Sequence, residues 1–411
     1  MNELIRHRRA LHRIPELGDK LKRTEGYLLS HLERLGCCLF RPGRCAVAAY
    51  FDFGQQKTLA FRADMDALPI PEETGLPFSS QFPGQSHACG HDGHMAILLR
   101  LCQWAAGQKS LGHNLLAVFQ PAEETQGGAD FLVGTGLFQL FRPEGIYGLH
   151  LWPDVPAGEI YTRPGAMMAQ SREVDVCFCG PGGHIASEEK SDPLMAAAQT
   201  LLFCQKEAPL QKEEVLLRFG RLRGGQVRNA LAQEAVLSGS LRCFSSEAGE
   251  RAVAGLQKAA DLAAQQHSCR GTVRLSRGYP VLENDPQLYE RSKALLGDAL
   301  RLLPRPVWQS EDFSFYQRAA PSLFFLLGCD SPHPLHHPGF CFDESVLEVG
   351  LSLFQQLATG EPPVVGMPPR ACRGQRLFKP PTDNPHFWFV EKGFSKGDSL
   401  EKISMAGAVR A

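Results

Sequence analysis

Short apolar runs alternate with a helical pattern in the first part of the sequence, and this alternation restricts the possible folds more than any other feature. The runs CAVAAYF (45–51), TLAFRA (58–63), NLLAVFQ (114–120) and GIYGLHL (145–151) resemble buried strands. A helical pattern, HMAILLRLCQWAA (94–106), lies between them. Strands that alternate with helices predict an α/β fold.

The pattern changes near residue 171. REVDVCFC (172–179) alternates polar and apolar residues, as a strand with one solvated face does, and helix and strand patterns of an α+β domain follow. The α/β pattern returns from about residue 285, with a helix through SKALLGDAL, the strand SLFFLLG (322–328) and a helix after Asp343. A chain of 411 residues is also longer than one compact core usually supports. We therefore predict an α/β domain, 1–170 and 285–361, that carries an inserted smaller α+β domain, 171–284.

The last fifty residues differ from both predicted domains. Seven prolines lie between positions 362 and 385, and no apolar periodicity supports a core. We predict that 362–411 is a Pro-rich, poorly ordered tail, although PHFWFV (385–390) is apolar enough to dock on a surface.

The charge balance excludes several classes of partner. Lys plus Arg (43) nearly equals Asp plus Glu (44), so no basic surface for nucleic acid or a membrane is indicated, and a small-molecule partner is favoured. No apolar run reaches the roughly 18 residues that span a bilayer, and the charged start lacks the apolar core of a secretory signal. The thirteen cysteines are an odd number without an extracellular context, so we expect reduced thiols and a cytoplasmic location.

Acidic and imidazole side chains recur where predicted strands end. Ligands bind at the carboxyl ends of strands in open α/β sheets, because loops from several strands meet there. These side chains are therefore expected to share one cleft. They are Asp64, Asp66, Glu123, Glu124, His150, His336 and His337.

The segment HACGHDGH (87–94) adds Cys89, His91 and His94 to these groups, just before the predicted helix. Thiolate, imidazole and carboxylate together suit a divalent ion such as Zn or Mn. Paired CxxC motifs, which mark structural zinc sites, do not occur, so an open catalytic site is favoured. Within the pair Glu123-Glu124, one carboxylate can bind metal while its neighbour removes a proton from water as general base.

These motifs resemble a family of dinuclear metallohydrolases that includes aminoacylases, hippurate hydrolase, auxin-conjugate amidohydrolases and N-acetyldiaminopimelate deacetylase. The resemblance runs from residue 2 to about 358. It rests on RRALHRIPELG, FRADMDALPI, HACGHDGH, FQPAEE, GLHLWPDVPAG, GPGGH and LHHPGFCFDE.

The resemblance implies a metal-dependent amidohydrolase with a zinc-peptidase-like catalytic domain and two divalent ions per subunit, Zn, Mn, Co or Ni. Cys89 would bridge the ions, Glu123 would be the base, and Asp64 would support the site. His336, rather than His337, matches the family's ligand. The implied metal ligands are Cys89, His91, Glu124, His150 and His336.

The inserted domain of such enzymes acts as a lid and often mediates dimerisation, which implies a homodimer or higher homo-oligomer. His184 of GPGGH and Asn229 match residues that approach the substrate on closure, and His184 would serve the partner subunit's site or its own. A substrate carboxylate also needs a donor, for which Asn229 and Arg242 are candidates.

Stretches such as ALPIPEETGLPFSSQ and DSPHPLHHPGFCFDESVLEVG look most like N-acetyldiaminopimelate deacetylases, which implies release of acetate from N-acetyl-diaminopimelate in lysine biosynthesis. A hippurate-type or other N-acyl amino acid or peptide amidohydrolase is the alternative, and a non-catalytic binding relative is a rival from another class. Ser187-Glu188 stand where relatives usually carry an aromatic residue and Pro, and Ser310 stands where Gly is usual. These departures leave the implied metal ligands intact, so they bear on the choice of substrate rather than on catalysis.

Overall fold

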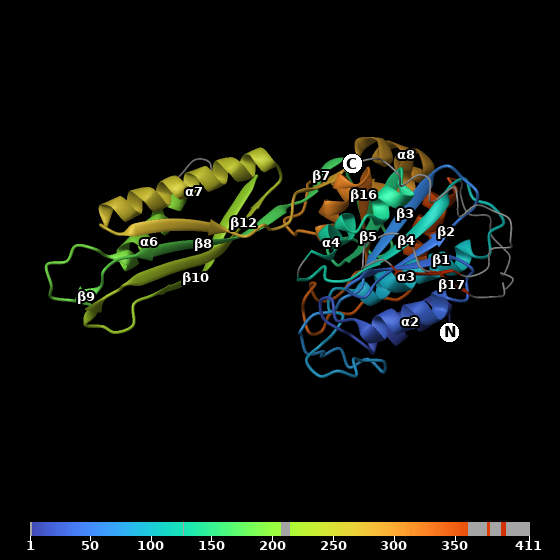
Figure 1. The fold of residues 1–411 in the computed structure, drawn as a ribbon, viewed down its shortest axis with the longest axis horizontal. Coiled ribbons are helices and arrows are strands. Elements are labelled where there is room, and N and C mark those ends of the chain that lie inside the picture. The colour runs from blue at the N-terminus through green and yellow to red at the C-terminus, as the bar shows by residue number, and fades with distance from the viewer. Residues whose placement is uncertain (1, 126, 207–213, 361–375, 379–387, 392–411) are drawn as a thin grey trace. The chain divides into compact units, whose positions relative to one another are not determined.

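The computed structural model describes residues 2–125, 127–206, 214–360, 376–378 and 388–391 (Figure 1). The chain forms two compact units. The first unit contains Met1–Gly165, Glu283–Pro304 and Phe315–Ala411, and the second contains Ala166–Leu282 and Arg305–Ser314.

The first unit is built on a sheet of mixed direction. In the described residues its strand order is β15-β6-β16-β5-β3-β4-β2-β1-β18-β17. The central strands β16, β5, β3 and β4 run parallel to one another, whereas β2 is antiparallel to β4. The bounds are β1 Cys38–Gly43, β2 Ala46–Phe51, β3 Thr58–Asp64, β4 Asn114–Gln120, β5 Gly145–Trp152, β6 Ile160–Thr162, β15 Leu300–Leu302, β16 Ser322–Gly328, β17 Arg376–Phe378 and β18 Trp388–Glu391.

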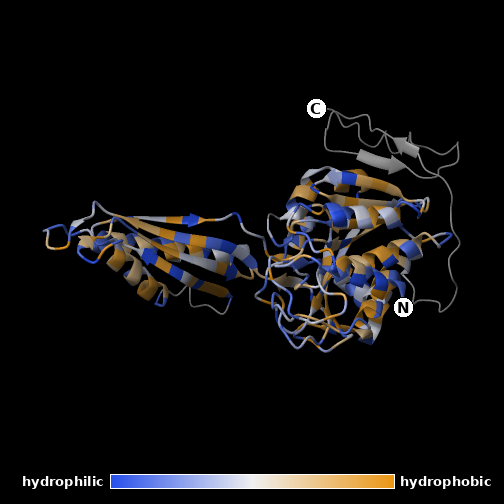
Figure 2. Ribbon diagram, turned by 90° about the horizontal axis from the view of Figure 1, so that it is seen from below, coloured by the Kyte–Doolittle hydropathy of each residue, from blue (hydrophilic) through white to orange (hydrophobic). Residues whose placement is uncertain are grey.

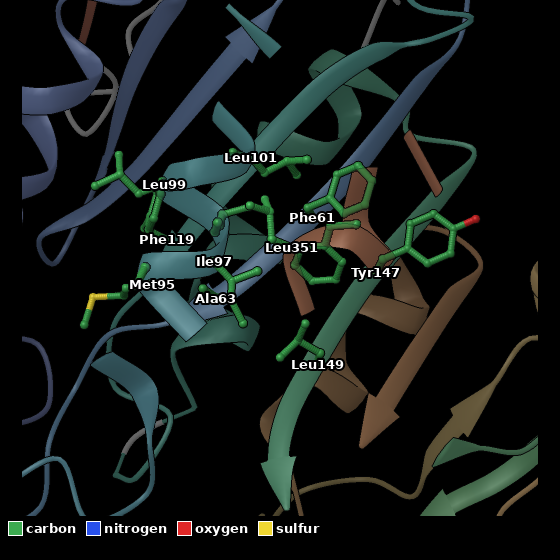
Figure 3. Close-up of a cluster of buried hydrophobic side chains, with 14 of the residues drawn as sticks. Phe61, Ala63, Met95, Ile97, Leu99, Leu101, Phe119, Tyr147, Leu149 and Leu351 are labelled. Carbon is green, nitrogen blue, oxygen red and sulfur yellow. The ribbon is translucent and has the colours of Figure 1, made fainter. Parts of the chain in front are cut away.

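Helix α3 fills the core on one face of this sheet. Figure 3 shows Ile97 of α3 packed among Phe61, Leu149 and Leu351, which come from β3, β5 and α9. On the other face Phe141 of α5 stacks on Tyr50 at 4.3 Å between ring centroids. The helices are α1 Glu3–His12, α2 Lys22–Leu32, α3 His91–Ala105, α4 Gly128–Gly134, α5 Leu137–Phe141, α8 Pro286–Leu296 and α9 Val346–Thr359.

The second unit has a four-stranded antiparallel sheet, ordered β10-β12-β8-β13, with α6 and α7 on one face (Figure 1). Val174, Val176 and Phe178 of β8 face these helices, whereas Glu173 and Asp175 are exposed, so the alternation predicts this strand correctly. The bounds are β7 Gly165–Met168, β8 Gln170–Cys179, β9 Gly183–His184, α6 Pro193–Cys204, β10 Val215–Gly224, β11 Ala230–Leu231, β12 Glu234–Cys243, α7 Ser246–Gln266, β13 Arg270–Leu275 and β14 Leu282–Asn284.

The α/β fold predicted from the strand and helix patterns is confirmed. The distribution of hydropathy agrees with it: hydrophobic residues (orange) lie on the inner strands, and hydrophilic residues (blue) lie on the outer faces of the helices (Figure 2). Two details differ from the prediction. Helix α8 ends at Leu296, because Gly297 has a positive φ of 55° that does not continue the helix, and a 3-10 turn at Gly297–Ala299 then leads into β15. The segment Arg305–Ser314 belongs to the second unit, since the backbone N–H of Ala169 bonds the carbonyls of Val307 and Gln309.

Most of the predicted tail 362–411 lies outside the described residues. The described parts are β17 and β18, and β18 pairs antiparallel with β1. None of the helices in the described ranges combines the length and apolar character that a membrane crossing requires.

Candidate metal centre

The candidate site lies where the central parallel strands end. Strand β3 ends at Asp64, β4 at Gln120, and His150 lies near the end of β5. Because parallel strands present their carboxyl ends at one edge, the segments that follow them meet there. The segment that begins α3 brings Cys89 and His91 to the same edge.

All five predicted metal ligands are brought together at this edge. Ligand atoms of Cys89, His91 and Glu124 lie within 4.8 Å of one another. The sulfur of Cys89 lies 3.4 Å from Nε2 of His150, and Nε2 of His336 lies 3.2 Å from Oε1 of Glu124.

Backbone carbonyls orient two of the imidazoles. Nδ1 of His91 donates to the carbonyl oxygen of Asp66, and Nδ1 of His150 donates to that of Leu151, each at 2.7 Å. Each ring therefore keeps its lone pair on Nε2, the atom that faces the other ligands. Burial lowers the pKa of both histidines, so both imidazoles are neutral and able to bind a metal ion.

The donor set fits a divalent ion. Within the described residues, the buried Nε2 of His91 has no hydrogen-bond partner, and carboxylate oxygens of Asp64 and Glu124 stand 3.7 and 3.9 Å away, beyond hydrogen-bond distance. Burial and the carboxylates of Glu124 and Glu123 raise the pKa of Cys89 well above its usual value. A cation among these groups would satisfy the nitrogen and favour the thiolate.

His94 lies beside this cluster, but both its nitrogens are already used. Nδ1 donates to Oδ1 of Asp64 at 2.7 Å, and Nε2 accepts from the backbone N–H of Leu151 at 2.9 Å. The other carboxylate oxygen of Asp64 accepts from Nη1 of Arg62 at 2.7 Å. Although burial opposes it, the adjacent His91, the guanidinium of Arg62 and the hydrogen bond from His94 hold the pKa of Asp64 well below its usual value. Asp64 is therefore an ionised group that anchors the histidines around it.

Asp66 fixes the backbone of the glutamate pair, a role that the sequence patterns did not assign. Its two carboxylate oxygens accept from the backbone N–H groups of Glu123 and Glu124, at 3.0 and 3.2 Å. The turn that carries the pair is tight: Ala122 has φ 59°, and a Cβ on Gly128 would lie 1.7 Å from the carbonyl oxygen of Pro121. The D-x-D spacing of Asp64 and Asp66 at the end of β3 is the sequence feature that could have indicated this role, because residues two apart along an extended chain point to the same side.

His336 and His337 have different environments. The left-handed backbone of His336 (φ 65°) and a 2.9 Å hydrogen bond from its N–H to the carbonyl of Ala88 direct it toward Glu124. Nδ1 of His337 instead accepts from the N–H of Gly339, and its ring stacks on His333 at 4.2 Å.

This difference predicts unequal effects of removing the two imidazoles. His336→Ala should lower metal affinity by at least about tenfold, because a ligand is lost, whereas His337→Ala should keep the metal content. Metal analysis after dialysis of both purified variants checks this. The reverse order of the two effects would show that the ligand has been assigned to the wrong histidine.

The second unit places His184 and Asn229 side by side. β9 and β11 pair, and the N–H of Ile185 donates to the carbonyl of Asn229 at 3.0 Å. Arg242 lies toward the opposite end of the neighbouring sheet, pairs in register with Ser171 and donates through Nη1 to the carbonyl of Trp308 at 2.7 Å. The structure therefore does not bring Arg242 together with Asn229.

The sequence of residues 60–360 matches the model of the family described as peptidase family M20/M25/M40. The chain belongs to this family. Membership confirms the resemblance inferred from the motifs and the predicted class of enzyme, a metal-dependent amidohydrolase.

Relatives of this M20 chain include two proteins named N-acetyldiaminopimelate deacetylase. The one from Listeria monocytogenes serotype 4b (strain CLIP80459) is 35% identical over 82% of this chain and 93% of its own length. The one from Streptococcus pneumoniae (strain CGSP14) is 34% identical over 86% and 97%, respectively.

Among solved structures, the YXEP protein of Bacillus subtilis, described as a dinuclear metal-binding peptidase of the M20 family, is similar to this chain. It has a TM-score of 0.78 and 28% identity over 87% of this chain and 96% of its own. This similarity supports the presence of bound metal in the M20 chain.

Proposed function

We propose that the chain hydrolyses N-acetyl-diaminopimelate to diaminopimelate and acetate, as a step of lysine biosynthesis. The names of the Listeria and Streptococcus relatives support this substrate. The observation that carries the hydrolytic function is the convergence of a thiol, three imidazoles and a carboxylate at one sheet edge, directly beside Glu123.

In this proposal the five converging side chains would hold two divalent ions. The ions would supply positive charge that lowers the pKa of water and polarises the acyl carbonyl. Their ligands are Cys89, His91, Glu124, His150 and His336.

Glu123 is the proposed general base. Its carboxylate accepts a proton from the attacking water as the new C–O bond forms, and it returns that proton to the amine nitrogen as the C–N bond breaks. The hydrogen bond from its backbone N–H to Asp66 holds the residue in place for both transfers. Asp64 keeps His94 and Arg62 in position behind the ligands.

His184 and Asn229 are the proposed substrate-binding pair of the second unit. An imidazole donor stabilises the oxyanion that forms on the acyl oxygen, and the Asn229 amide suits the free carboxylate of the substrate. The exposed position of His184 leaves its ring available to a ligand. Ser187 and Glu188 lie close to it in sequence, and the N–H of Ser187 bonds the His184 carbonyl at 2.9 Å, so we assign these departures to substrate choice.

Replacement of His184 by Ala should therefore lower kcat by at least about a hundredfold and leave the metal content unchanged, because the contact forms mainly with the developing oxyanion. Steady-state kinetics and metal analysis of the variant test this. Mixing His184→Ala with Glu123→Gln subunits extends the test. Recovered activity in the mixed oligomer would mean that His184 completes the partner's site, and no recovery would assign it to its own subunit.

Substrate profiling tests the proposed function as a whole. The metal-reconstituted enzyme should have a higher kcat/KM for N-acetyl-diaminopimelate than for hippurate, since the acetyl group is small and the substrate carries a distal amino acid group. The reverse order would favour a hippurate-type amidohydrolase. Failure to hydrolyse any N-acyl amino acid while metal is bound would favour a non-catalytic binding protein.

We also propose that the chain is a cytoplasmic homodimer or higher homo-oligomer that assembles through the second unit. Helix α6 exposes Leu194, Met195 and Leu202, with 41, 50 and 57% of their surface accessible. Contiguous exposed apolar residues favour a protein interface. Sedimentation velocity measures the assembly state, and a monomer at micromolar concentration would contradict the proposal.

A further inference from the structure

Charged side chains of helix α1 contact three segments that border the candidate metal centre. The helix packs against α3, and two of its charged residues, Arg8 and His12, are each only 2% exposed. Charged groups are rarely buried so deeply unless each has partners, and both residues have carboxylate partners from distant parts of the chain.

Arg8 joins the start of α3 to the segment before α9. Its Nε donates to Oδ2 of Asp92 at 2.9 Å, and its Nη1 donates to Oε1 of Glu344 at 3.1 Å. The guanidinium also lies over the rings of Phe78 and Phe342, at 4.8 and 4.6 Å. The planar guanidinium thus contacts two carboxylates and two aromatic rings at once. The compact ammonium of a Lys does not reproduce this set of contacts.

His12 binds the same carboxylate from another direction and adds a third segment. Its Nδ1 lies 2.8 Å from Oδ2 of Asp92, and its Nε2 lies 3.1 Å from Oε1 of Glu72. Both ring nitrogens face carboxylates, which accept hydrogen bonds only, so the ring donates from both and carries a positive charge. Glu72 in turn accepts from the N–H of Ser80, and the N–H of Glu73 bonds the carbonyl of Pro338.

Two of the segments tied in this way carry proposed metal ligands. Asp92 directly follows His91 and is three residues from Cys89, while Glu344 and Pro338 belong to the segment that carries His336. Asp92 is fully buried, so its position in the first turn of α3 depends on Arg8 and His12. We propose that Arg8 and His12 are positioning residues that set the metal affinity of the centre by holding the ligand-bearing segments in place.

Loss of such supporting contacts typically lowers metal affinity about 10–100-fold, and we expect effects of this size when Arg8 or His12 is replaced. The inference rests on the proposed metal centre, so Zn²⁺ binding is measured directly, by competition with a chromophoric chelator. Arg8→Lys keeps the charge but cannot bond both carboxylates, and it should weaken Zn²⁺ binding at least about tenfold. His12→Asn keeps a donor for Asp92 but loses Glu72, and it should weaken binding less.

Arg9→Ala is the matched control, because it removes an ion pair to Glu344 from the same helix but does not touch Asp92. Its Zn²⁺ affinity should stay within about twofold of the unaltered chain. Absorption spectra of the Co²⁺-loaded proteins add a readout of ligand geometry, and Arg8→Lys should shift the thiolate and ligand-field bands while Arg9→Ala leaves them unchanged. Folded Arg8→Lys and His12→Asn proteins with unaltered affinity and spectra would overturn the inference.

A measurement on the unaltered chain covers the case in which the variants do not fold. Coupling between two sites is reciprocal, so if α1 positions the metal ligands, Zn²⁺ must protect α1 against hydrogen exchange. Exchange in Glu3–His12 should slow on Zn²⁺ loading, and exchange in α8 should not. Equal exchange in α1 with and without Zn²⁺ would overturn the inference, and absence of Zn²⁺ binding would overturn the proposed function together with it.

Discussion

Cys89→Ala should lose bound metal and catalytic turnover together. The thiol lies within 4.8 Å of ligand atoms of His91 and Glu124 and 3.4 Å from Nε2 of His150, so its removal would take a donor from the middle of the proposed centre. A loss of about 4 kcal/mol of transition-state stabilisation corresponds to a thousandfold lower rate, and we expect kcat/KM to fall by at least that factor. Elemental analysis and kinetics on the same sample make the measurement.

Cys102→Ala is the control for this experiment. Cys102 is a fully buried thiol in the same helix region, but it lies in the apolar core around α3. Its removal should lower the free energy of unfolding by on the order of 1 kcal/mol and leave metal content and rate unchanged. Two ions retained by Cys89→Ala at an unaltered rate would refute the proposed centre.

Glu123→Gln should separate metal binding from catalysis. The amide keeps the size of the side chain and the hydrogen bond from the backbone N–H to Asp66, but it cannot accept a proton from water. The rate should fall by at least about a hundredfold, the usual scale for general acid-base catalysis, at near-normal metal content. Single-turnover kinetics on a sample of known metal content measure both quantities.

Glu124→Gln is the matched comparison, because the same change in the next residue removes a proposed metal ligand. It should lower metal affinity first and activity as a consequence. If Glu123→Gln loses metal and Glu124→Gln keeps it, the roles of the two carboxylates must be exchanged.

The strand pattern predicted that the candidate site residues converge, for a physical reason. Asp64, Glu123 and His150 follow buried apolar runs, and parallel pairing of those runs brings their ends to one edge of the sheet. The pattern of apolar residues along the sequence indicates which strands are buried. Buried strands that alternate with helices pair in parallel, and this pairing brings their carboxyl ends together.

The contacts that orient the site could not be predicted in this way. Arg8 pairs with Asp92 across 84 residues and with Glu344 across 336, and neither pairing leaves a periodic trace in the sequence. The role of Asp66 depends on two backbone N–H groups, whose direction is set by the turn at Ala122. Arg305–Ser314 lacks apolar periodicity, so its sequence does not indicate that it belongs with the second unit, whereas its contacts with Ala169, Arg242 and Phe244 do.

The parallel pairing of β5 with β16 also affects how the chain folds during synthesis. About 170 residues separate the end of β5 from the start of β16, and they include the whole of the second unit. Translation proceeds at roughly 5–20 residues per second, so β16 is synthesised on the order of 10–30 s after β5. An apolar strand edge is uncovered throughout that time, and such edges favour pairing with other chains. Slow folding to the active form and a dependence on chaperones during expression are the expected results.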